Sequence, residues 1–126
     1  MGEFDFHVDQ TKNRLYIRLS GFFREDESDA LFVALKTTLE QVRLGFDVVT
    51  DVRDLRPGSP KTAADLEKAV QMIKDTGRNR AIRITGGLVT GIMQFKRVVQ
   101  SVFGNDPKVR YVSSVEEADR ILDTPW

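Results

Sequence analysis

The stretch Phe46–Pro60, FDVVTDVRDLRPGSP, decides the fold that the sequence predicts. Its first five residues, Phe46–Thr50, have the apolar character of a buried strand, and the paired valines suit a central strand covered on both faces. A polar turn is expected next, and Ser59 followed by Pro60 is typical of a helix start. The turn places the Ser59 hydroxyl beside unpaired N–H groups at a helix N-terminus. An anion, a phosphoryl group or a partner's carboxylate is stabilised there.

Toward the N-terminus, the sequence predicts an antiparallel hairpin followed by a helix. Alternation of apolar and polar residues marks the two strands. The apolar residues of these strands are Phe4, Phe6 and Val8, and then Leu15, Ile17 and Leu19. The helix has Asp26 and Ser28 as alternative N-caps, and Gly45 is expected to end it. Its apolar stripe is Leu31, Leu35, Leu39 and Val42.

Toward the C-terminus, helices and strands alternate. A helix from Ser59 to Gly77 is followed by a strand over 81–84, and Gly86 and Gly87 precede a third helix. The apolar stripe of that third helix is Ile92, Phe95, Val99 and Val102. A strand over 109–112 and a last helix, opened by a capping box at 114–117, complete the order β-β-α-β-α-β-α-β-α. We therefore expect one α/β domain over residues 1–126, with a mixed, mostly parallel sheet of about five strands and four helices on its faces.

Composition excludes several classes of protein. The 126 residues carry 19 Lys and Arg against 19 Asp and Glu, so zero net charge argues against nucleic acid as a partner. The absence of cysteine excludes disulfides and thiol catalysis. The acidic start, Met1–Phe6, lacks the apolar run of a signal peptide, and no apolar stretch is long enough for membrane insertion. We expect a cytoplasmic protein.

Catalytic chemistry has few candidate residues in this sequence. The single histidine, His7, alternates with apolar residues on the first strand, so we expect it to face solvent. Asp51 and Asp54 are expected to make turn hydrogen bonds, with a carboxylate-only Mg²⁺ site as the alternative. The glycine-rich run 86–91 lacks the Lys-Ser/Thr that a phosphate loop requires. We therefore predict a protein that is not an enzyme, with no catalytic residue, no metal site and no cofactor.

Ser59 has two interpretations. As an N-cap, its hydroxyl accepts a hydrogen bond from the N–H of Lys61 or Thr62. As a phospho-acceptor or anion site, it is supported by Arg53 and Arg56 upstream, which can pair with added negative charge. A separate set of candidate contacts, for an apolar ligand or a partner, comprises Ile92, Met93 and Phe95 on the predicted third helix.

The chain resembles the STAS domains, the group that includes the bacterial SpoIIAA-like anti-sigma factor antagonists. The resemblance covers nearly the whole length and rests on the element order and on the wording Asp51–Ser59, DVRDLRPGS. It is closest to a SpoIIAA-like branch in which Asp-x-Arg-x-Leu-x-Pro-Gly-Ser recurs. In the antagonists, a serine at the matching place is phosphorylated by the partner anti-sigma factor. Here that place holds Ser59, and Pro60 after it removes one amide donor.

The resemblance implies a non-catalytic protein-interaction module, acting as a partner-switching regulator with an anti-sigma-like regulatory protein as its partner. The SpoIIAA-like relatives also resemble lipid-carrier folds, so the alternative is a carrier or sensor of a small apolar ligand. A packed core favours the interaction module, whereas an apolar cavity of roughly hundreds of Å³ favours the carrier. A second copy of the chain is a further candidate partner, as a homodimer.

Overall fold

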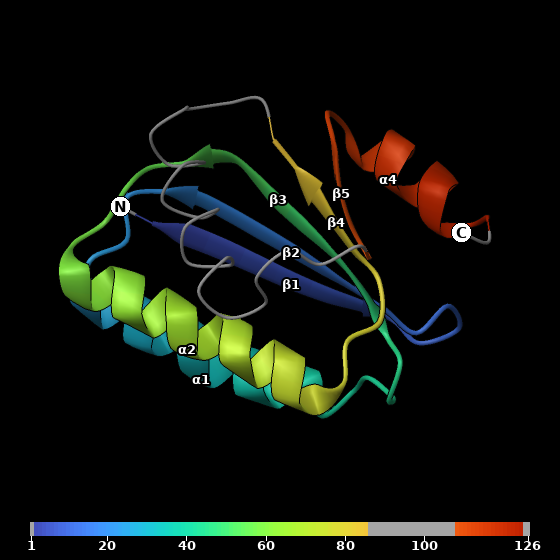
Figure 1. Cartoon of the computed structure of the whole chain (residues 1–126). Coiled ribbons are helices and arrows are strands. Elements are labelled where there is room, and N and C mark those ends of the chain that lie inside the picture. Colours follow the sequence, from blue (N-terminus) through green and yellow to red (C-terminus); the bar gives the residue numbers. More distant parts are fainter. Residues whose placement is uncertain (1, 86–107, 125–126) are drawn as a thin grey trace.

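A five-stranded mixed sheet forms the centre of the molecule (Figure 1). The computed structural model describes residues 2–85 and 108–124. The strands are β1 (Glu3–Asp9), β2 (Arg14–Gly21), β3 (Asp47–Leu55), β4 (Ala81–Ile84) and β5 (Val109–Val112), in the spatial order β1-β2-β3-β4-β5. β1 and β2 form the predicted antiparallel hairpin, and the other three neighbouring pairs are parallel.

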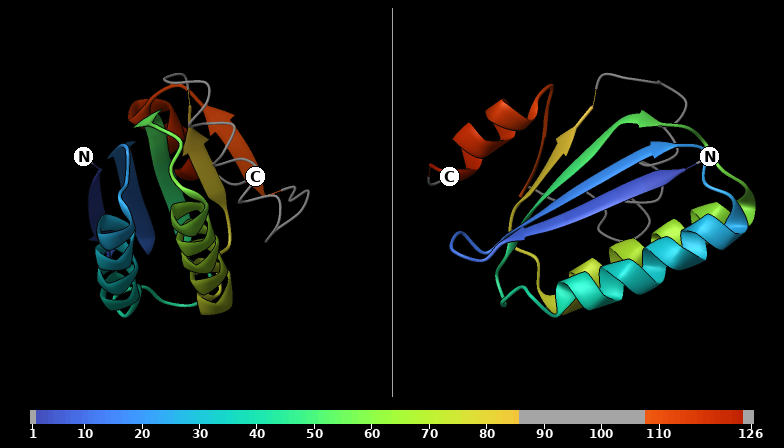
Figure 2. Two further views of the ribbon diagram at one scale, coloured as in Figure 1. Left: turned by 90° about the vertical axis from the view of Figure 1, so that its left-hand side faces the viewer. Right: turned by 180° about the vertical axis from the view of Figure 1, so that it is seen from behind.

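The described helices cover the two faces of the sheet unequally. They are α1 (Glu25–Leu39), α2 (Pro60–Thr76) and α4 (Val115–Leu122). α1 and α2 lie side by side along one face, and the short α4 lies on the other face at one end (Figures 1 and 2). We call the first the helix-pair face and the second the α4 face. The main apolar core lies under the helix pair, and a smaller cluster lies beneath α4.

β3 is longer than predicted, because the expected polar turn after Thr50 is part of the strand. The register of β2 against β3 shifts between Arg18 and Ser20, and the pairing then continues to Leu55. Val52 and Leu55 are fully buried in the main core. Pairing and burial therefore hold this polar segment in the sheet.

The start of α1 also differs from the prediction. Its N-cap is Arg24, and neither Asp26 nor Ser28 occupies that position. Glu27 accepts a hydrogen bond from the Arg24 N–H at 3.0 Å through its Oε1. The Ser28 hydroxyl is buried and donates a hydrogen bond to Asp65 on α2. The serine that the sequence suggested as an N-cap therefore makes a tertiary contact.

Two further expectations concern helix extent and number. α1 ends at Leu39 and does not reach Gly45, because the chain turns back toward the β1–β2 hairpin, where the Arg43 N–H donates to Asn13 Oδ1 at 2.8 Å. The structure describes three helices where the sequence predicts four. The remaining predicted helix, with Ile92 and Phe95, falls within 86–107 and lies outside the described residues.

Candidate functional site

The loop between β3 and α2 holds Ser59 at the end of the molecule where α1 and α2 begin (Figure 1). The Arg56 N–H donates to Gly21 O at 3.0 Å, which ties the loop to the end of β2. Gly58 follows, and a Cβ there would lie 2.7 Å from Thr62 Cγ2, so the close approach requires glycine. The loop therefore delivers Ser59 to the first turn of α2 in one fixed position.

Ser59 is the N-cap of α2, as predicted. Its Oγ accepts from the Thr62 N–H at 3.2 Å and donates to Thr62 Oγ1, also at 3.2 Å. Thr62 Oγ1 in turn donates to the carbonyl oxygen of Phe23 at 3.2 Å. This chain of hydrogen bonds joins the cap of α2 to the segment that follows β2. The Ser59 side chain thus has both a donor and an acceptor partner, although the residue is still partly exposed.

The structure separates Arg53 from this cap. Arg53 makes a two-point ion pair with Asp51 on β3, with Nε–Oδ1 at 3.1 Å and Nη2–Oδ2 at 2.8 Å. Burial raises the pKa of Asp51, but the hydrogen bonds from Arg53 outweigh it and hold the pKa below its ordinary value. Within residues 2–85 and 108–124, no hydrogen bond or ion pair joins Arg53 or Arg56 to Ser59, and Arg56 is exposed.

A polar cluster that the sequence did not reveal joins the first turns of α1 and α2. The Ser28 Oγ donates to Asp65 Oδ2 at 2.6 Å, and Lys61 Nζ lies 2.9 Å from the same oxygen and 3.0 Å from Asp29 Oδ1. The hydrogen bond from Ser28 and the contact with Lys61 lower the pKa of Asp65. Both carboxylates raise the pKa of Lys61. The only sequence feature that indicates part of this cluster is the i, i+4 spacing of Lys61 and Asp65, which is typical of an ion pair on one helix.

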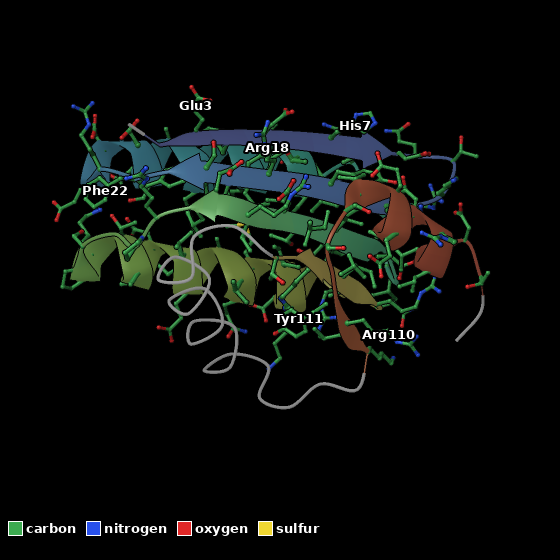
Figure 3. All side chains as sticks on the ribbon, turned by 90° about the horizontal axis from the view of Figure 1, so that it is seen from above. Glu3, His7, Arg18, Phe22, Arg110 and Tyr111 are labelled. Carbon is green, nitrogen blue, oxygen red and sulfur yellow. The ribbon has the colours of Figure 1, made fainter. Side chains whose placement is uncertain are left out.

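Polar and apolar residues together line a hollow of about 110 Å³ on the α4 face. His7 is exposed there, as predicted, and its ring centroid lies 6.0 Å from that of Tyr16. Figure 3 shows His7 and Arg18 on this face. In the described part of the chain, no three His, Asp or Glu side chains are placed to hold a metal ion. Asp51 and Asp54 instead pair with Arg53 and Arg18.

Two hollows among the described residues bear on the apolar-ligand alternative. A cavity of about 40 Å³ lies between the sheet and the helix pair, with Ile17, Leu35 and Leu66 among its mostly apolar lining residues. That is far below the roughly 300 Å³ of a small ligand pocket. A shallow groove of about 390 Å³ lies between α1 and α2, but four of its six lining residues are polar. The predicted contacts Ile92, Met93 and Phe95 lie outside the described residues and stay a prediction.

The described helices contain no segment that is both long and apolar enough to cross a membrane.

Comparison with known proteins identifies the fold. No family model and no curated protein matches the sequence. The chain is similar to the anti-sigma factor antagonist SpoIIAA in its unphosphorylated form, with a TM-score of 0.64 and 15% identity over 98% of this chain and 100% of the other. It is also similar to an uncharacterized protein from Shewanella loihica with a SpoIIAA-like fold, with a TM-score of 0.71 and 14% identity over 97% and 95%.

A third similar structure is the Bacillus cell fate determinant SpoIIAA in the phosphorylated form, with a TM-score of 0.60 and 17% identity over 94% of this chain and 99% of the other. The chain therefore has a SpoIIAA-like fold, as the sequence predicts. At these identities the likeness is one of fold.

Proposed function

We propose that this protein is a non-catalytic interaction module that binds a regulatory protein through the end of the molecule around Ser59. The observation that carries the proposal is the position of the Ser59 hydroxyl, which caps α2 within a partly exposed loop. The similar structures support it, because they include an anti-sigma factor antagonist in unphosphorylated and phosphorylated forms.

An exposed aromatic side chain lies close to the same loop. Phe22 follows β2 directly and is 43% exposed, and its neighbour Gly21 accepts the hydrogen bond from the Arg56 N–H. Figure 3 shows Phe22 at this end of the sheet. Exposed aromatic residues are frequent anchors of protein interfaces. We therefore assign Phe22 as an anchor for the partner, beside the serine that controls the contact.

Phosphorylation of Ser59 would change both charge and hydrogen bonding at this surface. A phosphoryl group brings roughly −1.5 to −2 charges and acceptor oxygens. These oxygens can accept from the Thr62 N–H at the positive end of the α2 dipole, but the bond that Ser59 donates to Thr62 Oγ1 is lost. Lys61 is the nearest cation along α2, and it is already paired with two carboxylates. We expect the added charge to act mainly on the partner.

The test compares Ser59→Ala and Ser59→Asp. A tagged protein captures its partner from the native host, and binding is then measured with the purified partner by calorimetry. We expect Ser59→Ala to keep the partner, Ser59→Asp to weaken binding, and Phe22→Ala to weaken it without any change of charge. Ser114→Asp is the matched control, because Ser114 caps α4 on the other face. Equal binding by wild type, Ser59→Asp and Phe22→Ala would refute the proposal.

A further inference from the structure

β1 is a long edge strand with one unused side. Among the residues that the structure describes, it pairs with β2 alone. The pairing is continuous over all seven residues, from Glu3 opposite Ser20 to Asp9 opposite Arg14, with no bulge. Proteins usually protect such edges with charged side chains, above all lysine, or with proline, a bulge or a covering element. The sequence of β1, EFDFHVD, contains neither lysine nor proline, and its three carboxylates alternate onto the α4 face alone.

The side chains on the two faces of β1 alternate in a way that suits the addition of a further strand beside it. Glu3, Asp5 and His7 are exposed on the α4 face, as Figure 3 shows for Glu3 and His7. The apolar residues on the helix-pair face are only partly buried against the core. They are Phe4, Phe6 and Val8. An added strand with the same alternation would complete the burial of these three side chains.

α1 leaves this edge accessible. Glu27 Oε1 accepts from the Gly2 N–H at 3.3 Å, so the flank of α1 that carries Glu27 is turned toward β1. Ala30 and Ala34, three and seven residues further along, lie on the same flank of the helix. These side chains are small, and we therefore expect no obstruction of a strand placed beside β1.

We propose that β1 binds β1 of a second copy of this chain, antiparallel and about a two-fold axis at Phe6, so that one sheet runs through a dimer. The register that places Phe6 opposite its own copy is the one that uses all seven residues. It sets Phe4 opposite Val8 and Asp5 opposite His7, each pair occurring twice by symmetry. Read backward about Phe6, the strand matches apolar with apolar residues and Asp5 with His7, while its two ends place one carboxylate opposite another.

The polar residues of the strand form both attractive and repulsive pairs in this register. A histidine ring donates at least one N–H to a carboxylate in either protonation state, so the Asp5–His7 contact is attractive. The register also brings Glu3 opposite Asp9 at the two ends. The Asp9 carboxylate accepts from the Lys12 N–H at 3.1 Å within the hairpin turn, which compensates part of its charge. Registers centred on any other residue of the strand pair five residues or fewer, and none of them covers Phe4, Phe6 and Val8 together.

Analytical ultracentrifugation of the purified full chain tests the dimer. A seven-residue edge buries less area than a standard interface, so we expect a reversible dimer whose population rises with concentration. His7→Glu should weaken association roughly tenfold, because two attractive contacts become like-charge contacts. The double variant Asp5→Lys/His7→Glu should restore it. Gln71→Glu, on the exposed side of α2, adds the same charge and should leave association unchanged. A wild type that stays monomeric at all concentrations would overturn the proposal.

Cysteine cross-linking tests the register, and the chain contains no cysteine of its own. Residues opposite one another on antiparallel strands lie within disulfide reach. An oxidised mixture of Asp5→Cys and His7→Cys proteins should form a disulfide-linked heterodimer, while neither variant alone should cross-link. Efficient cross-linking of Asp5→Cys to itself would refute the register. The Ser59 variants should dimerise like wild type, so this result is separable from the proposed function.

Discussion

Different interactions hold the described helices against the two faces of the sheet. On the helix-pair face, two long helices bury a continuous apolar core. On the α4 face, an eight-residue helix buries Ala118 and Leu122, and polar groups at one end of the sheet hold it. Tyr16 OH donates to Asp119 Oδ1 at 2.5 Å, and the Arg14 guanidinium lies 3.2 Å from the same oxygen. Among the described residues, apolar packing therefore dominates the helix-pair face, and a smaller apolar cluster together with a few directional polar bonds positions α4 on the other face.

This difference predicts how each face responds to change. Packing energy is spread over many contacts, so damage to the helix-pair face should lower the stability of the whole chain. The anchors of α4 are local, and loss of one should release α4 before the rest unfolds. Arg80 adds to these anchors, because it pairs with Asp47 at 2.6 Å and donates to Leu122 O at 3.1 Å.

The largest loss of stability is expected for substitution of Leu35, which is 1% exposed beneath the helix pair. Leu35→Ala should lower the free energy of unfolding by about 2–5 kcal/mol, because it removes buried methyl groups and leaves a cavity. Urea unfolding followed by circular dichroism measures the change. Val33→Ala is the control, since Val33 is 65% exposed on the same helix and should cost less than about 0.5 kcal/mol. Equal costs for the two would contradict the description of this face.

The next largest loss of stability is expected for substitution of Arg14. Its side chain is 3% exposed and pairs with Asp119 and Asp123. Those carboxylates are 38% and 48% exposed, so water partly replaces the lost contacts. Arg14→Met should therefore cost about 1–2 kcal/mol. Hydrogen exchange should show faster exchange in α4 and unchanged exchange in α2. The same acceleration in both helices would show that the two faces unfold as one unit.

The two serine caps compare the faces directly. Ser59→Ala should lower the free energy of unfolding by about 1 kcal/mol, because the Thr62 N–H loses its acceptor. Ser59→Asp should be tolerated, since a carboxylate also caps and suits the helix dipole. Ser114 accepts from the Glu117 N–H in the same way. We expect Ser114→Ala to appear as local exchange in α4, with little change in global unfolding. A global loss at Ser114 equal to that at Ser59 would speak against the difference.

The smallest effect is the pH dependence of stability. Hydrogen bonding from Ser28, then from Lys61, lowers the pKa of Asp65 in the folded state. Its contribution is complete above the unfolded pKa, near 4, and is lost as the pH falls through the folded value. The melting temperature should therefore fall below about pH 4, and Asp65→Asn should flatten that dependence.

Asp123, on the α4 face, is the carboxylate to compare with Asp65, because its pKa is also lowered in the folded state. Lys12, then Arg14, lowers its pKa, but its side chain is 48% exposed against 12% for Asp65. Asp123→Asn should flatten the curve less than Asp65→Asn does. A larger effect at Asp123 would place the acid-sensitive contacts on the α4 face.

Local patterns in the sequence predicted much of the secondary structure and the candidate cap. The β1–β2 hairpin follows from alternation of apolar and polar residues, and the Ser59 cap follows from Ser-Pro at a helix start. Gly77 ends α2 with a φ of 98°, as a glycine C-cap should. The sequence motif DVRDLRPGS was part of the basis for the resemblance to STAS domains, and the SpoIIAA-like fold agrees with that resemblance. These features depend on neighbours within a few residues, so sequence alone determines them.

Contacts between distant segments decided the rest. The polar end of β3 became strand because β2 pairs with it beyond a shift in register. Ser28 became a buried donor to Asp65, 37 residues away. Partners so far apart in sequence leave no periodic pattern, because their free energy depends on how the chain brings them together. Local sequence determined most of the elements and the Ser59 cap, and tertiary structure determined long-range partners such as Ser28 with Asp65 and Arg80 with Asp47.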